Sequence, residues 1–128
     1  MESPAELEAL DAAVREWRGS SCAYSEPVAR VVADASEWRR LWNDAFSAPA
    51  PEVDFSKYFA AAVFLGLRAT GGYSVEFLPP AVERDAVVVR HRTRSPSPGS
   101  FVIQALTQPY AIRLYRKTPS PVRISEVR

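Results

Sequence analysis

Residues 58–77 read YFAAAVFLGLRATGGYSVEF, and this stretch decides the fold class. Tyr58 to Leu67 is almost entirely apolar, as in a central strand that is covered on both faces. Thr70-Gly71-Gly72 then favours a tight hairpin turn, because glycine supplies the positive φ that short turns need. From Tyr73 to Phe77 apolar and polar residues alternate, which predicts a strand with one buried face. This succession indicates an antiparallel sheet.

Strand-like patterns continue toward the C-terminus, separated by turn residues. The predicted strands are 86–93, 101–106, 110–115 and an edge strand at 122–124. Pro79-Pro80 should end the preceding strand or displace it to a sheet edge. Glu83-Arg84-Asp85 is a polar turn. Connections this short leave no room for crossover helices, which disfavours a doubly wound fold.

One helix is predicted upstream of residue 58. Val28 to Ala33 is a short β-rich run, and Asp34 or Ser36 after it is a candidate N-cap. Apolar side chains then fall on one helical face at Trp38, Leu41, Trp42, Ala45 and Phe46. We therefore expect a helix near 35–46.

The first residues have two interpretations. Leu7, Leu10, Val14 and Trp17 are spaced like one face of a helix. The alternative is a partly ordered leader whose last part, Val14 to Arg18, is a strand. We expect residues 1–18 to form a helical or partly ordered leader and residues 19–128 a single β-rich domain.

The predicted fold class is α+β, mainly antiparallel β, in a sandwich or curved sheet of about six to eight strands. It includes the helix near 35–46 and, in the helical interpretation of the leader, a second helix at the N-terminus. The 128 residues are 47% apolar and 24% charged, which is typical of one globular domain.

The scarcity of reactive residues argues against an enzyme. The chain has one Cys and one His, so it cannot form an internal disulfide or a Cys/His zinc site. Asp44, Glu52 and Asp54 do not match a calcium loop, and Asp54 is better interpreted as a cap or turn residue. His91 shares a predicted strand face with Val87 and Val89, without a recognisable catalytic partner. We expect no catalytic residue, no metal and no cofactor.

The N-terminus has neither a basic region followed by an apolar one nor a lipoprotein signal. No apolar run is long enough for a transmembrane helix. We therefore expect a cytoplasmic protein, or an extracytoplasmic one if a leader has been removed.

The charge distribution leaves one alternative function. Residues 1–64 are acidic and residues 65–128 are basic, although the net charge is only +1. Arg90, Arg92 and Arg94 would line one face of a strand, which could bind nucleic acid or simply be a solvated surface. A net charge this small makes nucleic acid an unfavoured partner.

Two segments carry the candidate contact residues for a protein partner. The first is Thr70, Gly71, Gly72 and Tyr73, where glycines permit close approach and the tyrosine can anchor an interface. The second contributes Gln104, Thr107, Gln108 and Tyr110. The structural alternatives are a hairpin turn with a core tyrosine and satisfaction of backbone groups near Pro109.

These segments also carry a family resemblance. Val63-Phe64-Leu65-Gly66 followed by Thr70–Val75 resembles the C-terminal domain of the bacterial PrcB family, which is named for a component of a protease complex. The same order of motifs includes Glu37-Trp38 with Leu41-Trp42, Val53–Ser56, Pro98-Gly99 and Gln104–Tyr110. The resemblance runs from about Gly19 to Ile124. It implies a non-catalytic domain that binds another protein and associates with or stabilises a protease, as the founding lipoprotein does with a secreted subtilisin-like protease.

A second resemblance is confined to one turn. Thr70-Gly71-Gly72-Tyr73 is similar to the Thr-Thr-Gly-Tyr loop of inhibitors of papain-like cysteine peptidases, although Arg68-Ala69 replaces their Asn-Pro. It implies a loop-type peptidase inhibitor as the alternative form of protein binding.

Overall fold

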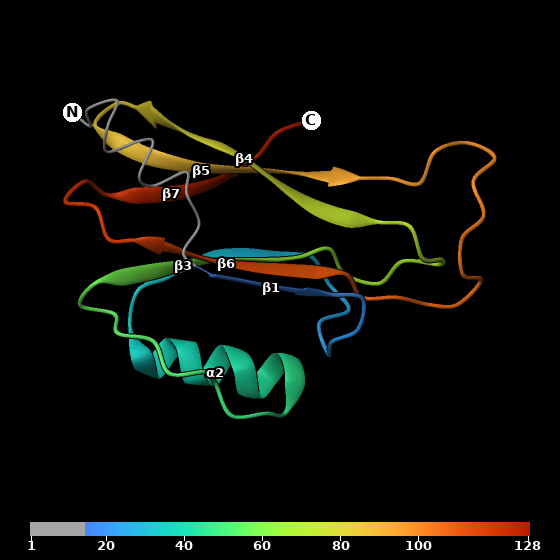
Figure 1. Ribbon diagram of the computed structural model, residues 1–128, viewed down its shortest axis with the longest axis horizontal. Coiled ribbons are helices and arrows are strands. Elements are labelled where there is room, and N and C mark those ends of the chain that lie inside the picture. The colour runs from blue at the N-terminus through green and yellow to red at the C-terminus, as the bar shows by residue number, and fades with distance from the viewer. Residues whose placement is uncertain (1–14) are drawn as a thin grey trace.

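A computed structural model describes residues 15–128, which form two facing sheets and one helix (Figure 1). The first sheet has the strand order β1-β6-β3-β2 and the second has the order β4-β5-β7. The strands are β1 Arg15–Gly19, β2 Val28–Val32, β3 Tyr58–Phe64, β4 Ser74–Glu83, β5 Ala86–Arg94, β6 Tyr110–Arg116 and β7 Val122–Glu126. Helix α2, Ala35–Phe46, lies on the outer face of the first sheet. The predicted α+β class with mainly antiparallel strands is confirmed, in its sandwich form.

Strand β3 is the centre of the first sheet and is buried along nearly its whole length. It pairs with β2 on one side and with β6 on the other, antiparallel in both cases. Alternate side chains, at Phe59, Ala61 and Val63, enter the core between the sheets. The others, at Ala60, Ala62 and Phe64, pack beneath α2. The predicted strand with two covered faces is therefore confirmed.

Helix α2 begins and ends as its sequence indicates. The Asp34 carboxylate accepts a hydrogen bond from the backbone N–H of Glu37 at 2.8 Å, which makes Asp34 the N-cap. Trp38, Leu41 and Ala45 are buried against the sheet. Ser47 ends the helix in the left-handed conformation, with a φ of 50°.

The second sheet is a hairpin with an added parallel strand. Strands β4 and β5 join through Arg84 and Asp85, both at positive φ, so the predicted polar turn is confirmed. The register of β4 shifts between Leu78 and Ala81, at the prolines, and β4 lies at the sheet edge as expected. Strand β7 is the predicted edge strand, but it pairs with β5 in parallel.

Two expectations about the connections were wrong. Residues 70–72 do not form a hairpin turn, because β3 and β4 lie in different sheets and the segment crosses from one sheet to the other. Residues 101–106 do not form a strand. Only single backbone hydrogen bonds hold this segment, and prolines at 96, 98 and 109 remove donors on both sides of it.

The expected N-terminal helix lies mainly outside the described residues. Trp17, the last residue of its spacing, is in β1, which pairs with β6. The strand alternative for the end of the leader therefore holds over residues 15–18, and β1 spans the domain boundary expected between residues 18 and 19. Within residues 15–128, no helix has the length and hydropathy needed to cross a membrane.

Removal of the helix cap should destabilise the fold. Asp34→Ala leaves the Glu37 N–H without its acceptor, so we expect the free energy of unfolding to fall by about 1 kcal/mol. Urea denaturation followed by tryptophan fluorescence measures this change. Asp44→Ala is the matched control, because Asp44 is exposed in the last part of the same helix, where a negative charge opposes the helix dipole. Equal losses in both variants would contradict the capping role.

Candidate functional site

Two long connections meet at one end of the sandwich (Figure 1). Residues 65–73 leave β3 there and residues 95–109 enter β6 there. Arg68 and Thr107 exchange two backbone hydrogen bonds, of 2.8 and 2.9 Å, and the Gly71 N–H donates to the Ile103 carbonyl at 2.9 Å. The Thr107 hydroxyl donates to the Thr70 carbonyl at 2.9 Å. The fold thus joins the two segments that contain the predicted contact residues.

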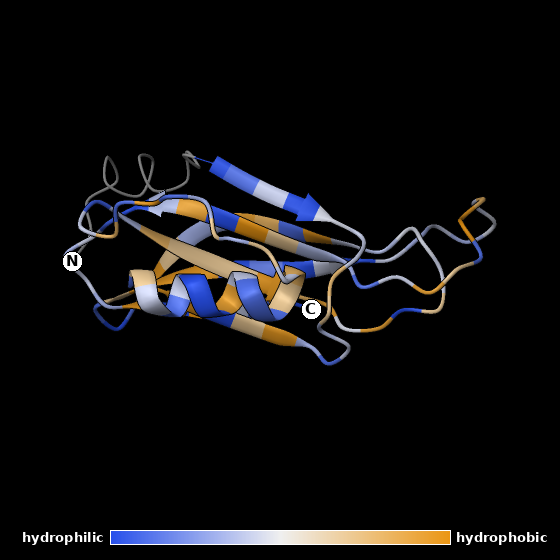
Figure 2. Ribbon diagram, turned by 90° about the horizontal axis from the view of Figure 1, so that it is seen from below, coloured by the Kyte–Doolittle hydropathy of each residue, from blue (hydrophilic) through white to orange (hydrophobic). Residues whose placement is uncertain are grey.

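The joined loops expose large apolar side chains. The relative exposures are 48% for Leu67, 106% for Phe101, 71% for Ile103 and 65% for Leu106. These four residues are called the loop surface below. Figure 2 shows hydrophobic residues on the loop that projects beyond the strands. Exposed apolar residues grouped in this way are typical of an interaction site.

The two loops also carry little charge, since Arg68 is their one charged residue. Residues 95–109 and residues 69–73 contain no Asp, Glu, Lys or Arg. Charged residues are depleted and aromatic residues enriched in the buried centre of protein interfaces. The composition of both loops therefore agrees with burial against a partner rather than with a solvated surface.

The two predicted glycines, Gly71 and Gly72, let the two loops pack closely against each other. Gly72 has a φ of +91°, and a Cβ there would lie 2.8 Å from the Pro96 Cβ and from the Val102 Cγ1. A Cβ on Gly71 would lie 3.4 Å from the Ile103 Cβ. No side chain fits at Gly72 without displacing the second loop. The contribution of Gly72 is thus close packing of the two loops.

The other predicted contact residues are divided between the loops and the core. Gln104 is exposed on the projecting loop, and Tyr73 packs against the core between the sheets. The Gln108 N–H donates to the Ser20 carbonyl at 2.9 Å. Tyr110 packs on Phe46 beneath α2, with ring centroids 4.8 Å apart, so its side chain belongs to the core between α2 and the first sheet.

The four residues of the loop surface were not predicted as contact residues. Leu67 lies at the end of the predicted apolar strand 58–67, and the other three lie in the predicted strand 101–106, which implies that alternate apolar side chains are buried. The sequence signal for an uncovered loop at 101–106 was the combination of its flanking residues, Pro96, Pro98, Gly99 and Pro109, with the absence of charge over 95–109. A segment enclosed by prolines is a poor ladder partner, and its apolar side chains then remain uncovered.

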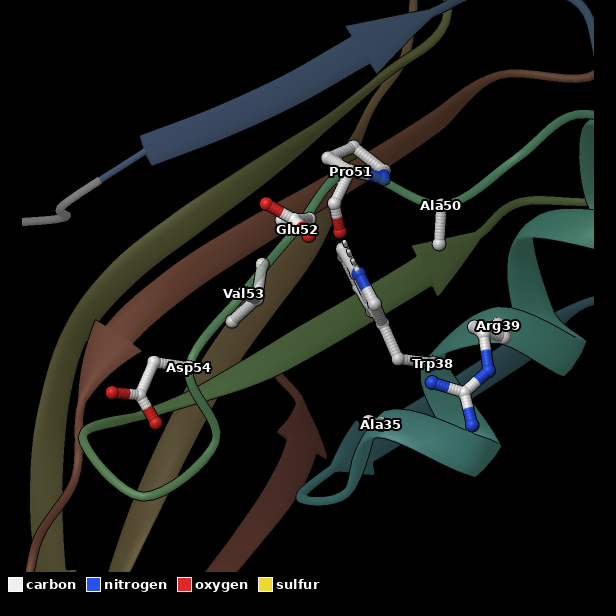
Figure 3. A pocket seen from close by; sticks show the side chains of 8 residues that line it. All are labelled: Ala35, Trp38, Arg39, Ala50, Pro51, Glu52, Val53 and Asp54. Atoms are coloured by element: carbon white, nitrogen blue, oxygen red, sulfur yellow. Dashed lines mark hydrogen bonds between the residues drawn. The ribbon is translucent and has the colours of Figure 1, made fainter.

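A groove between α2 and residues 50–54 is the second candidate site (Figure 3). Its volume is about 500 Å³, and Trp38, Arg39, Pro51 and Asp54 contribute to its walls. The Trp38 Nε1–H donates to the Pro51 carbonyl at 2.8 Å. Asp54 accepts from the Ser56 N–H and hydroxyl, which confirms its turn role and lowers the pKa of its carboxyl group. The Trp38 indole and the Asp54 carboxylate are thus engaged by the fold itself, so neither marks the groove as a ligand site.

The arginine strand is partly neutralised by one carboxylate. Arg92 and Arg94 both form ion pairs with Glu76, and hydrogen bonding by Arg92 lowers the pKa of that carboxyl group. Arg90 donates from Nε and Nη2 to the Pro79 carbonyl. All three guanidinium groups are thus already engaged, two of them by a single shared carboxylate, and this arrangement does not favour binding of phosphates.

His91 is buried and Cys22 is partly buried. His91 is 5% exposed, and its Nδ1 is buried without a hydrogen-bond partner. The Cys22 thiol contacts the carbonyl oxygens of Tyr24 and Gln108, and burial raises its pKa, which weakens it as a nucleophile. Within residues 15–128, no three His, Cys, Asp or Glu residues form a metal-binding group.

Burial of His91 should make the stability depend on pH. Burial lowers the pKa of His91 below its ordinary 6.5, an effect that Glu126 partly opposes. The unfolded chain then binds a proton more readily than the folded one, so the free energy of unfolding falls as the pH drops below about 6.5. Urea unfolding at pH 8, 7, 6 and 5 measures this loss. His91→Leu should be flatter over this range, and an unchanged slope in the variant would assign the effect to other groups.

The comparisons with known proteins support one family. Residues 60–113 match the family described as PrcB C-terminal, a stretch that runs from β3 into β6 and contains the whole loop surface. No curated protein and no solved structure matches the chain significantly. The family resemblance is therefore confirmed over this stretch, which is less than half of the chain.

Proposed function

We propose that this chain is a non-catalytic domain that binds another protein, in a complex that contains a protease. The observation that carries the proposal is the loop surface, where four large apolar side chains are exposed on loops whose one charged residue is Arg68. Leaving them in water is unfavourable, and burying them against a partner recovers this free energy. The PrcB C-terminal match supports a protease-related partner.

Phe101 is the expected anchor of this contact. It is fully exposed, whereas Ile103 is held at its base by the hydrogen bond from Gly71. Interfaces usually depend on a few large side chains, with aromatic ones prominent among them. The backbone hydrogen bonds between the two loops limit the ordering cost of binding, because part of the loop conformation is already fixed.

The proposed non-catalytic role is supported by the surroundings of the reactive residues. His91 has no carboxylate or nucleophile among its hydrogen-bond partners in the part of the chain that the structure describes. A general base needs such partners to orient it and to supply a proton. The two carboxylates with the clearest ion pairs, Glu16 and Glu76, are each paired with arginines.

The test removes the apolar side chains without disturbing the core. In Phe101→Ser/Ile103→Ser/Leu106→Ser we expect at least a 30-fold loss of affinity, since each hot-spot side chain contributes about 2 kcal/mol. The chain is used to isolate its partner from its native source, mass spectrometry identifies a protease, and biolayer interferometry measures affinity. Stability of the variant should change little, because the replaced side chains are exposed.

Arg116→Ser/Lys117→Ser is the matched control. Both residues are exposed: Arg116 is the last residue of β6 and Lys117 follows it, at the end of the strand opposite to the loop surface. Equal binding by the loop variant and the wild type would contradict the proposal. Measurement of protease activity in the complex then separates inhibition, which predicts lost turnover, from association, which leaves turnover intact.

A further inference from the structure

A second cavity opens between the two sheets at the edge formed by β2 and β7. It has a volume of about 470 Å³ and receives side chains from both sheets. Val28 and Leu65 give it an apolar wall, and Arg68, His91, Thr93 and Glu126 give it polar atoms. This cavity differs from the groove beside α2 because some polar atoms of its residues have no hydrogen-bond partner.

Two nitrogen atoms of the cavity residues have no hydrogen-bond partner. The Arg68 Nε and the His91 Nδ1 are both buried and unpaired. Arg68 uses only its Nη2, which donates to the Leu65 carbonyl at 3.3 Å. Buried polar atoms are almost always satisfied in native proteins, so two unsatisfied nitrogens among the residues of one cavity mark a place where a ligand can complete the hydrogen bonding after a small shift of these side chains.

Arg68 also has no counter-charge. It is partly buried, and none of the ion pairs among residues 15–128 includes it, whereas Arg18, Arg92, Arg94 and Arg113 all reach a carboxylate. Its guanidinium group is held over the Tyr73 ring, 5.1 Å from the centroid. The stacked ring and the Leu65 carbonyl fix the position of the cation. A partly buried cation that is fixed and unpaired favours an anionic ligand.

We propose that this cavity binds a carboxylate joined to an apolar group, with Arg68 as its ionic partner and His91 as a second hydrogen-bond donor. The apolar wall accommodates the apolar part of the ligand. The Glu126 carboxylate on the same cavity repels anions, and it repels a doubly charged phosphate more strongly than a singly charged carboxylate. The C-terminus of a peptide and a free aliphatic acid both present this chemistry. The proposal is independent of the loop surface.

The single histidine of the chain supplies a direct probe. The untagged full chain is titrated with hexanoate and hexanamide, and with an acetylated tetrapeptide ending in leucine as its free acid and as its amide. The His91 ring-proton resonance reports binding. We expect each binding carboxylate to shift this resonance and to bind at least about tenfold more tightly than its amide. A response to hexanoate alone identifies a free acid as the ligand, and a response to the peptide identifies a protein C-terminus.

Variants distinguish the ionic contact from nonspecific binding. Arg68→Gln should weaken carboxylate binding by about tenfold, and Glu126→Gln should strengthen it by about threefold. Arg39→Gln, an exposed change on α2, should leave it unchanged. Glu126 is exposed, so its variant keeps the test decisive if Arg68→Gln does not fold.

Three results would overturn the proposal. The first is an equal response to carboxylate and amide. The second is no response up to roughly 10 mM ligand, a concentration that corresponds to negligible affinity. The third is an unchanged affinity in Glu126→Gln.

Discussion

Burial of β3 on both faces is the constraint on which the rest of this structure depends. Its side chains alternate between two cores, one shared with the second sheet and one shared with α2. The residues at 60, 61 and 62 are all alanine, so large partners supply the volume on each side. Tyr115 stacks on Phe59 at a centroid distance of 5.3 Å in the first core. Trp38 extends from α2 into the second core. A polar residue anywhere in this strand would enter one core or the other.

The position of β3 also explains where the loop surface lies. Strand β3 ends, and its antiparallel neighbour β6 begins, at the same end of the sandwich. The connection that leaves β3 and the one that enters β6 must therefore meet there. Their short hydrogen-bonded contacts between Arg68 and Thr107 and between Gly71 and Ile103 hold the loops together without extending either sheet. Apolar side chains beyond these contacts have no strand or helix to cover them.

The two edges of the sandwich are closed in different ways. At the β1 and β4 edge, the Arg18 Nη1 donates to the Val75 carbonyl at 2.7 Å, and Glu16 pairs with Arg18 and Arg113. At the β2 and β7 edge, polar groups line a cavity and two of their nitrogen atoms stay unpaired. One edge is thus sealed by its own ion pairs, whereas the other has the capacity to accept a ligand.

The local pattern of the sequence determined most elements of this protein. Apolar continuity at residues 58–64, the Asp34 cap and the polar turn at Arg84 act over a few neighbouring residues, and each was predictable. The family motifs likewise follow the order of the sequence. Tertiary structure alone decided which sheet each strand joins, that β7 runs parallel to β5, and that residues 101–106 stay outside both sheets. Strand pairing and burial depend on partners far away in the chain, so an apolar segment has the same local pattern whether it is covered, as in β3, or exposed, as at Phe101.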